Sequence, residues 1–206
     1  MTNARVITIT NLKGGSGKTS TAVPLACMAA RTGKTVLLDL DPTGSAAQWH
    51  AAAGLDDLFA CQRITDEQLA PTLQQLNASG EVQYVLLDTP PVAKEVTLQS
   101  MGEADLVLFP THVGSGDLAQ LVQTLGLLRL PLKANPALKY MVVLNHAGTM
   151  PAVTRETRQV VEEYGAAVAT TEIPYRKTYI TAKGSRPTAD WWHFEQLWRE
   201  VQGALA

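Results

Sequence analysis

Short apolar runs recur along the chain and alternate with longer stretches of mixed polarity. The clear runs are Val6–Thr10, Thr35–Leu40, Tyr84–Asp88, Leu106–Pro110 and Lys139–Leu144. A shorter candidate lies at Ala167–Ile173. Runs without an exposed face indicate parallel strands covered by helices on both sides. The stretches between them predict helices at Thr19–Arg31, Thr43–Ala53, Asp66–Leu76, Gly116–Arg129, Thr154–Tyr164 and Asp190–Ala204.

This alternation predicts an α/β fold with a doubly wound, mostly parallel sheet flanked by helices. We find no internal repeat, low-complexity tract or linker, so residues 1–206 are expected to form a single domain. In such a sheet, ligands bind outside the carboxyl ends of the strands. Polar residues gather at those ends: Asp39 and Asp41 close the second run, Asp88 closes the third and Asn145 follows the fifth.

A glycine-rich segment, KGGSGKTS, follows the first strand and leads into the first helix. A strand, a glycine turn and a helix N-terminus form a phosphate site, because backbone N–H groups and the helix dipole converge on the anion. Lys18 would reach the β- and γ-phosphate oxygens, and the Thr19 hydroxyl would ligate Mg2+. The strict P-loop pattern fails only at Leu12, where glycine is expected. The expected phosphate-binding residues are Gly14, Gly15, Ser16, Gly17, Lys18, Thr19 and Ser20. The alternative, a glycine turn with a solvated lysine, is disfavoured by the flanking strand and helix.

Three carboxylates, those of Asp39, Asp41 and Asp88, are candidates for binding Mg2+ or for activating water. Asp88 ends an apolar strand as a Walker B acid does, although an aspartate before Thr-Pro-Pro can also simply begin a turn. Asp39 and Asp41 lie two residues apart, and either of them could instead cap the following helix. We expect Asp39 and Asp88 to face Mg2+, in part through water, since Mg2+ keeps part of its hydration shell. Asp41 is expected to position the attacking water.

Composition narrows the class of protein. The formal net charge is -2, which excludes a globally basic nucleic-acid binder, so any DNA affinity must come from a local patch or from assembly. The two cysteines, Cys27 and Cys61, lie far apart and are expected to be reduced. The N-terminus lacks a signal-peptide pattern and no apolar run could span a bilayer, so we expect a cytoplasmic protein.

Together these motifs resemble the ParA/MinD group of deviant Walker A ATPases. The matching segments are KGGSGKTS at 13–20, DLDP at 39–42 and DTPP at 88–91, and more weakly Asn145 and residues 173–176. The resemblance implies a P-loop NTPase with a three-layer sandwich fold, which binds ATP and Mg2+. It further implies an ATP-bound homodimer in which Lys13 reaches the partner's nucleotide, with Lys13, Lys18 and Asp41 serving catalysis. Asn145 and Pro174 would approach adenine.

The same resemblance favours the small ParA subgroup that uses a separate ParB-like partner, because the short N-terminus leaves no room for a helix-turn-helix. Two positions depart from the pattern. Thr43 stands where glutamine is usual, and Pro24 lies inside the first helix, where a kink or a compensated turn is expected. Neither change removes a group that phosphate binding needs.

The segment 176–187 carries four cations and no acid. A solvated loop would explain this charge, but the resemblance favours non-sequence-specific binding to duplex DNA and association with the nucleoid. The candidate DNA-binding residues are Arg155, Arg158, Arg176, Lys177, Lys183 and Arg186. At the C-terminus, Trp191, Phe194 and Trp198 follow helical spacing. Acids at 190, 195 and 200 oppose only Arg199 there, which disfavours binding to anionic lipid and favours a core-packing helix.

The leading hypothesis is therefore an ATPase that segregates or positions plasmid or chromosomal DNA, or another cargo, and whose hydrolysis a partner stimulates. A second hypothesis is a P-loop small-molecule kinase, or an ATP-dependent ligase resembling dethiobiotin synthetase. The sequence shows no separate acid, base and anchor for such an acceptor. Metal-cluster relatives would need cysteines at a dimer seam, and Cys27 is expected to face the core.

Overall fold

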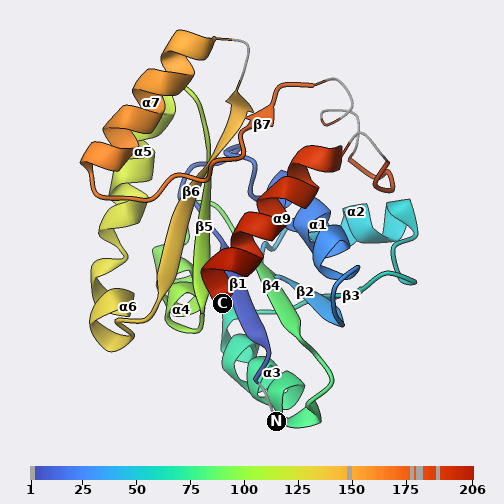
Figure 1. The fold of residues 1–206 in the computed structure, drawn as a ribbon. Helices are drawn as coiled ribbons and strands as arrows, with labels where there is room; N and C mark the ends of the chain where they lie inside the picture. Colours follow the sequence, from blue (N-terminus) through green and yellow to red (C-terminus); the bar gives the residue numbers. More distant parts are fainter. Residues whose placement is uncertain (1–2, 148–149, 177–178, 180–182, 189–190) are drawn as a thin grey trace.

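Seven parallel strands form the centre of the molecule (Figure 1). In this computed structural model the described residues are 3–147, 150–176, 179, 183–188 and 191–206. The strands are β1 (Arg5–Ile9), β2 (Thr35–Asp39), β3 (Ala60–Arg63), β4 (Tyr84–Asp88), β5 (Leu106–His112), β6 (Lys139–Ala147) and β7 (Ile173–Pro174). The helices are α1 (Lys18–Ala29), α2 (Ser45–Ala53), α3 (Asp66–Ser79), α4 (Lys94–Gly102), α5 (Ser115–Gly126), α6 (Arg129–Ala134), α7 (Pro151–Glu163) and α9 (Trp192–Leu205).

The strand order β3-β2-β4-β1-β5-β6-β7 places β1 in the middle of the sheet. β1 pairs in parallel with β4, Arg5 opposite Tyr84, and with β5, Ile7 opposite Leu106. All named strand pairs in the described chain are parallel. Their carboxyl ends therefore meet at one edge of the sheet, and the loop after β1 leaves that edge near its centre.

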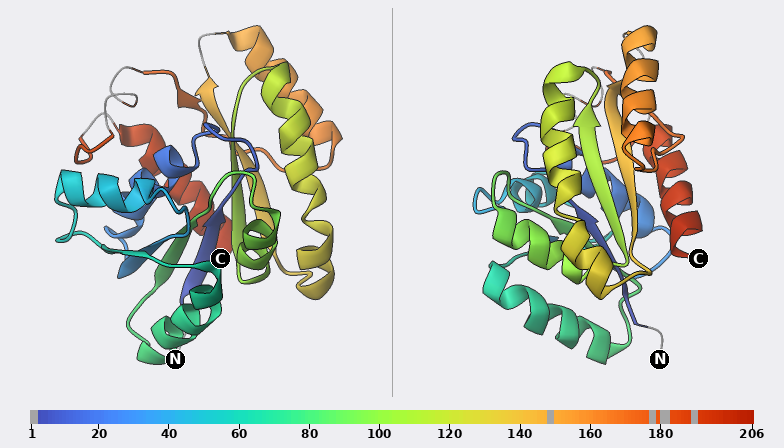
Figure 2. Two further views of the ribbon diagram at one scale, coloured as in Figure 1. Left: turned by 180° about the vertical axis from the view of Figure 1, so that it is seen from behind. Right: turned by 90° about the vertical axis from the view of Figure 1, so that its left-hand side faces the viewer.

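Helices cover both faces of the sheet, as the side view in Figure 2 shows. Alternate strand residues supply the two sides. Ile7, Leu37 and Leu86 pack with α1, α2 and α9 on one face. On the other face, Val6, Leu38 and Leu87 pack with α3, and a second cluster around Val107 and Phe109 packs with α4, α5 and α7. The predicted doubly wound α/β sandwich is thus confirmed.

Four elements differ from the sequence-based prediction, and one of them is the short helix α6, which follows the helix predicted at 116–129. β3 was not predicted because it is a polar, largely exposed edge strand. α4 was missed because its buried residues are Thr97, Ser100 and Met101, which give little apolar periodicity. The strand expected at 167–173 is wrong in extent: only Ile173–Pro174 forms a strand, with an isolated bridge from Val168 to Val142.

α1 is one continuous α-helix although Pro24 lies inside it. Pro24 has no N–H to donate toward Ser20, so the Ser20 carbonyl gives up its usual helical partner. The helix is almost wholly buried between the sheet and α9, and this packing offsets the missing bond. The expected disruption is therefore compensated without a break.

Within the described chain, no helix has the length and apolar character needed to cross a membrane.

Candidate functional site

The loop between β1 and α1 has the backbone shape that an anion site requires. Gly15 and Gly17 have φ of 74° and 96°, which residues with a Cβ rarely adopt. A Cβ at Gly17 would also lie 2.4 Å from the Asn145 Nδ2 atom. Gly17 is the N-cap of α1, and no side chain caps the helix. The N–H groups of its first turn are thus available to a phosphate.

Lys18 folds back over this loop. Its Nζ donates to the Asn11 carbonyl at 2.9 Å and to the Lys13 carbonyl at 3.0 Å, and only 7% of the residue is exposed. Burial lowers the pKa of Lys18, while Asp88 and Asp41 act in the opposite direction. A phosphate bound in the loop would replace two neutral acceptors by a charged one. Charge-assisted hydrogen bonds are about twice as strong as neutral ones.

Thr19 and Asp88 meet beneath the loop, joining the start of α1 to the end of β4. The Thr19 hydroxyl donates to Asp88 Oδ2 at 2.7 Å. The other oxygen, Asp88 Oδ1, is buried without a hydrogen bond in the described part of the chain, and burial raises the pKa of Asp88 to about 7. A hydroxyl and an unsatisfied carboxylate fit the protein ligands of Mg2+ in P-loop proteins, whose other ligands are waters and phosphate oxygens. Among the described residues, no group of three or more His, Cys, Asp or Glu is placed to hold a metal ion.

Asp39 has a different environment from Asp88. Its Oδ1 accepts from the Asp41 N–H at 3.0 Å, and its Oδ2 accepts from the Ala47 N–H at 2.9 Å in the first turn of α2. Burial raises the pKa of Asp39, while these two N–H groups lower it. Both oxygens thus tie the turn at Asp41 and the start of α2 to the sheet. The helix-capping alternative describes this geometry better than direct metal ligation does.

Asp41 lines the cavity beside the phosphate loop. One of its carboxylate oxygens accepts from the Thr43 N–H at 2.8 Å, and its carbonyl accepts from the Gly44 N–H at 2.8 Å. The Thr43 hydroxyl is 2.9 Å from the Ser45 hydroxyl. Thr43, which stands where glutamine is usual, therefore contributes its backbone to fixing Asp41 and its side chain to the start of α2.

The cavity beside the phosphate loop has a volume of about 500 Å³, which is the size of a small-molecule site. Asn145 and Pro174 both line it, so the structure brings the two predicted adenine-side residues together. Asn145 Nδ2 donates to the Ser16 carbonyl at 3.2 Å. Asn145 Oδ1 and the Ser16 hydroxyl are buried without hydrogen-bond partners in the described chain. Unsatisfied buried polar atoms are costly, and Asn145 lines a cavity that a ligand can fill.

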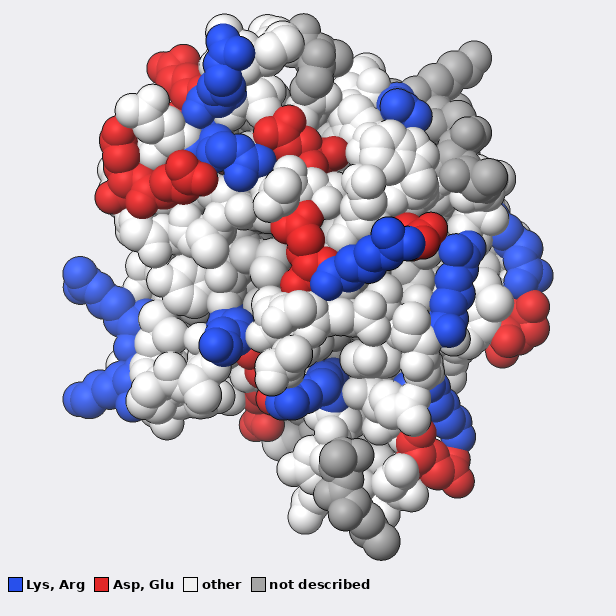
Figure 3. All heavy atoms as spheres, viewed as in Figure 1, with Lys and Arg blue, Asp and Glu red and all other residues white. Residues whose placement is uncertain are grey.

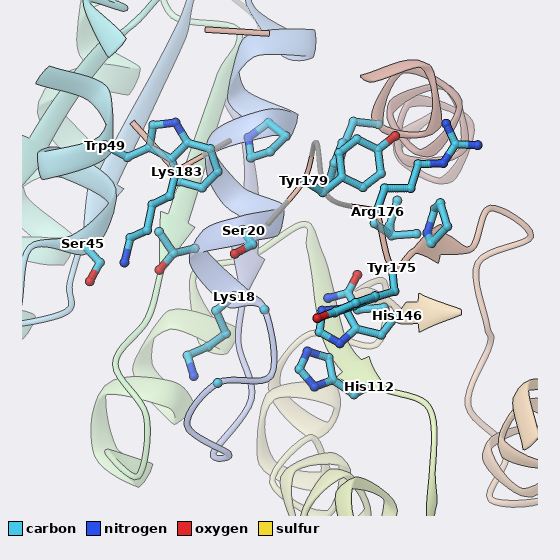
Figure 4. Close-up of a pocket in the computed structure, with 18 of the residues that line it drawn as sticks. Lys18, Ser20, Ser45, Trp49, His112, His146, Tyr175, Arg176, Tyr179 and Lys183 are labelled. Carbon is cyan, nitrogen blue, oxygen red and sulfur yellow. The ribbon is translucent and has the colours of Figure 1, made fainter. Parts of the chain in front are cut away.

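Aromatic side chains line the rest of the cavity, and sequence analysis did not single them out. His112 and His146 stack with ring centroids 3.9 Å apart, and the Tyr175 ring meets His146 edge-on at 4.7 Å. Figure 4 shows these three on one side of the pocket and Trp49 with Lys183 on the other. The available signal was position: His112 and His146 lie at the carboxyl ends of β5 and β6.

Lys13, at the start of the loop, contacts α5. Its Nζ is 2.6 Å from Asp117 Oδ1, in the first turn of α5. Asp117 was not among the predicted site residues, because nothing in its local sequence marks it.

The cations proposed for DNA binding do not form one patch. Arg158 pairs with Glu172 at 3.0 Å, and Arg186 contacts both oxygens of Asp57 at 2.7 Å. Arg155 and Arg158 lie on α7, whereas Asp57 follows α2, and the two helices lie on opposite sides of the molecule in both face views (Figures 1 and 2). Arg155 and Arg158 therefore lie apart from Arg186. Lys177 lies outside the described residues. Of the other candidates, Arg155, Arg176, Lys183 and Arg186 are exposed, and among these four Arg186 is the one that pairs with a carboxylate of the described residues.

Comparison with known proteins agrees with this geometry. A model of the CobQ/CobB/MinD/ParA nucleotide binding domain matches residues 7–187. The maintenance of carboxysome distribution protein A of Halothiobacillus neapolitanus is 29% identical over 180 residues, which is 87% of this chain and 83% of that protein. The chromosome-partitioning ATPase Soj of Thermus thermophilus is 30% identical over 201 residues, with coverage of 82% and 81%. Among solved structures, the MinD cell division protein of Aquifex aeolicus aligns with a TM-score of 0.76 and 19% identity, over 97% of this chain and 98% of that one.

Proposed function

Because the chain belongs to the CobQ/CobB/MinD/ParA nucleotide-binding family, we propose that it is a partition or positioning ATPase. In this proposal it binds ATP with Mg2+, dimerises around the nucleotide and, as a dimer, binds duplex DNA without sequence preference. The observation that carries the proposal is the phosphate loop with its two lysines. Lys18 folds back over the loop, the Lys13 side chain pairs with α5, and the Thr19–Asp88 pair lies beside them. The relatives named for chromosome partitioning and carboxysome distribution support the same class of activity.

The loop residues would divide the work of nucleotide binding. The N–H groups of residues 14–20 and the Lys18 amine bind the β- and γ-phosphates, while Asn145 and Pro174 contact the base. Thr19 and Asp88 would hold Mg2+, which when bound neutralises charge on the phosphate oxygens. Asp88 is held near protonation by burial, so a cation at its free oxygen would lower its pKa and stabilise the ionised form.

Hydrolysis would depend on Asp41 as the carboxylate that orients the attacking water. Asp39 would hold Asp41 in place, because its carboxylate accepts from the Asp41 N–H and from the Ala47 N–H at the start of α2. In the dimer, Lys13 of one protomer would reach the phosphates bound by the other and stabilise charge that develops there. Slow turnover by the protein alone is expected if a ParB-like or adaptor partner completes the site, as activators do in other P-loop switches.

DNA binding would rest on the exposed cations Arg155, Arg176 and Lys183. A modest number of cations in one protomer binds DNA weakly, but a dimer doubles the phosphate contacts. The affinity for DNA would then depend on which nucleotide is bound. In the cytoplasm, the ATP-bound dimer would associate with the nucleoid. Cargo would be moved by cycles of binding and partner-stimulated release.

The test measures oligomeric state and DNA binding with no nucleotide, ADP or a non-hydrolysable ATP analogue. We expect dimers and tight binding to random duplex DNA only with the analogue and Mg2+. Lys13→Ala should keep nucleotide binding and lose both responses. If the analogue binds but changes neither mass nor DNA affinity, the proposal is wrong.

The alternative is a small-molecule kinase or ligase, a class that the CobQ and CobB names in the family also include. Among the described residues that line the cavity, Asp41 is the only acid, and several aromatic side chains lie beyond the loop. These aromatic side chains offer a surface for a nucleotide base. Stoichiometric ATP-dependent modification of a metabolite would favour the alternative.

A further inference from the structure

We propose that Asp117 is a positioning residue that holds Lys13 within its own protomer and thereby opposes ATP-dependent dimerisation. The inference rests on the proposed function, in which Lys13 must reach a second protomer. The first turn of α5 would then control when the Lys13 side chain extends to a second protomer. The evidence is a set of contacts between α5 and the outer half of the phosphate loop.

One face of α5 follows the loop. Asp117, Leu121 and Thr124 are spaced by four and three residues, so they lie on the same side of the helix. Leu121 is fully buried and anchors this face. The Thr124 hydroxyl accepts from the Leu12 N–H at 3.3 Å, and its one proton lies between the Gln120 carbonyl at 2.8 Å and Asn11 Oδ1 at 3.3 Å. Thr124 thus fixes the loop at its start, and Asp117 meets the next residue along, Lys13.

The main chain of Lys13 is already fixed on both sides. Its N–H donates to Asn11 Oδ1 at 3.0 Å, and until a phosphate takes over the Lys18 amine its carbonyl accepts from Lys18 Nζ at 3.0 Å. Only the side chain can move to a second protomer while the loop keeps its shape. That side chain ends 2.6 Å from Asp117 Oδ1. Reaching across a dimer therefore requires this ion pair to open.

The pair is more protected than a surface salt bridge. The Lys13 side chain is 30% exposed and that of Asp117 is 15% exposed, so solvent screens them only in part. Asp117 also lies in the first turn of α5, where the positive end of the helix dipole favours a carboxylate. One amine cannot bind Asp117 and a partner's phosphate at once. The two contacts compete, and every dimer must open two such pairs.

The first test compares dimerisation with the non-hydrolysable analogue and Mg2+ by sedimentation velocity. Asp117→Asn removes the charge without changing the size of the side chain, and Asp117→Glu should retain the pair. If each pair opposes dimerisation about three-fold, Asp117→Asn lowers the dissociation constant of the dimer about ten-fold, since two pairs open. The matched control is Glu195→Gln, which breaks the exposed 2.6 Å pair with Arg199 on α9 and should leave the constant unchanged.

The second test does not need dimers. Lys13 acetylation by a soluble acetylating reagent, followed by peptide mass spectrometry, reports how free the amine is in the nucleotide-free protein. Lys13 should react several-fold faster in Asp117→Asn than in the parent or in Asp117→Glu. Asp117→Asn should not restore dimers to Lys13→Ala, because the effect of Asp117 acts through Lys13.

The outcomes separate the two proposals. If the parent dimerises and Asp117→Asn dimerises no better, or Lys13 reacts equally in both, the role of Asp117 is overturned and the proposed function stands. If neither the parent nor Asp117→Asn dimerises with bound analogue, the proposed function fails, and the inference fails with it.

Discussion

At the scale of single residues, Asp39 and Asp88 end neighbouring strands after similar apolar runs, and the sequence gives them the same expected role. The structure separates them by hydrogen bonding: backbone N–H groups occupy both oxygens of Asp39, whereas Asp88 keeps one free. This difference comes from where α2 begins relative to β2, which no local pattern encodes. The glycines, Lys18 and Thr19 were predictable because each has a fixed place in a strand–turn–helix unit. The contact between Lys13 and Asp117 was not predictable, because 104 residues separate them.

Asp88 makes stability depend on pH in the absence of nucleotide and metal. Its pKa rises from 3.8 to about 7 on folding, so the folded protein binds the proton more tightly than the unfolded chain. The free energy of unfolding therefore falls as the pH rises through this window and levels off above it. Asp88→Asn should remove most of this fall and stabilise the free protein at pH 8 by up to about 4 kcal/mol. Urea unfolding at pH 5 and pH 8 measures the effect.

Two comparisons define the result for Asp88. Glu103→Gln, at an exposed carboxylate after α4, should leave the difference between the two pH values unchanged. Asp39 has a pKa that is also raised, so a smaller slope should persist in Asp88→Asn. A slope equal to that of the parent would rule out Asp88 as its source.

At the scale of elements, α9 shows what helical spacing alone leaves open. The sequence predicted an amphipathic helix near the C-terminus, and both core packing and membrane contact were possible. Phe194, Leu197, Trp198 and Val201 are buried, and α9 packs on α1. The prediction of a core-packing helix is confirmed. Long amphipathic helices and fully apolar strands were thus predictable, whereas β3 and α4, whose exposed or polar residues carry no periodic signal, were not.

Trp198 is the main anchor of α9. Its Nε1 donates to the Thr32 hydroxyl at 3.1 Å. Its ring packs edge-on against that of Tyr84, with ring centroids 4.8 Å apart. Trp198→Ala should lower the free energy of unfolding by about 3–5 kcal/mol, as for other large-to-small core substitutions. Trp192→Ala is the matched control on the same helix. Trp192 is 43% exposed, so it should cost about 1 kcal/mol or less by the same urea titration. Equal losses would contradict the assignment of α9 to the core through Trp198.

At the scale of the whole molecule, charge is dispersed. Figure 3 shows Lys and Arg interspersed with Asp and Glu across the described part of one face, in keeping with a net charge of -2. A single protomer therefore offers few unneutralised cations to DNA. In the proposed function, affinity must come from doubling these cations in the dimer, which makes DNA binding sensitive to both nucleotide and salt.

The individual cations should contribute differently to DNA binding, depending on whether a carboxylate pairs with them. Arg176→Gln removes an exposed charge and should weaken binding of the analogue-bound protein to all duplex sequences alike. It should also lower the slope of log affinity against log salt by about 1 for each protomer. Arg186→Gln should have a smaller effect, because Asp57 already neutralises Arg186. Fluorescence anisotropy over a series of salt concentrations measures both slopes. Equal slopes for the two variants would show that the ion pairs do not decide which cations meet DNA.

The central position of β1 has a consequence for how the protein is made. β1 leaves the ribosome first, yet its neighbours in the sheet are β4 and β5, far later in the chain. Until Tyr84–Asp88 has been synthesised, both edges of the first strand lack their native partners, and the glycine loop has no strand end to hold it. Such distant pairing slows folding and leaves an apolar strand exposed to aggregation. The nucleotide site can therefore form only after the chain has been made as far as β4 and β5.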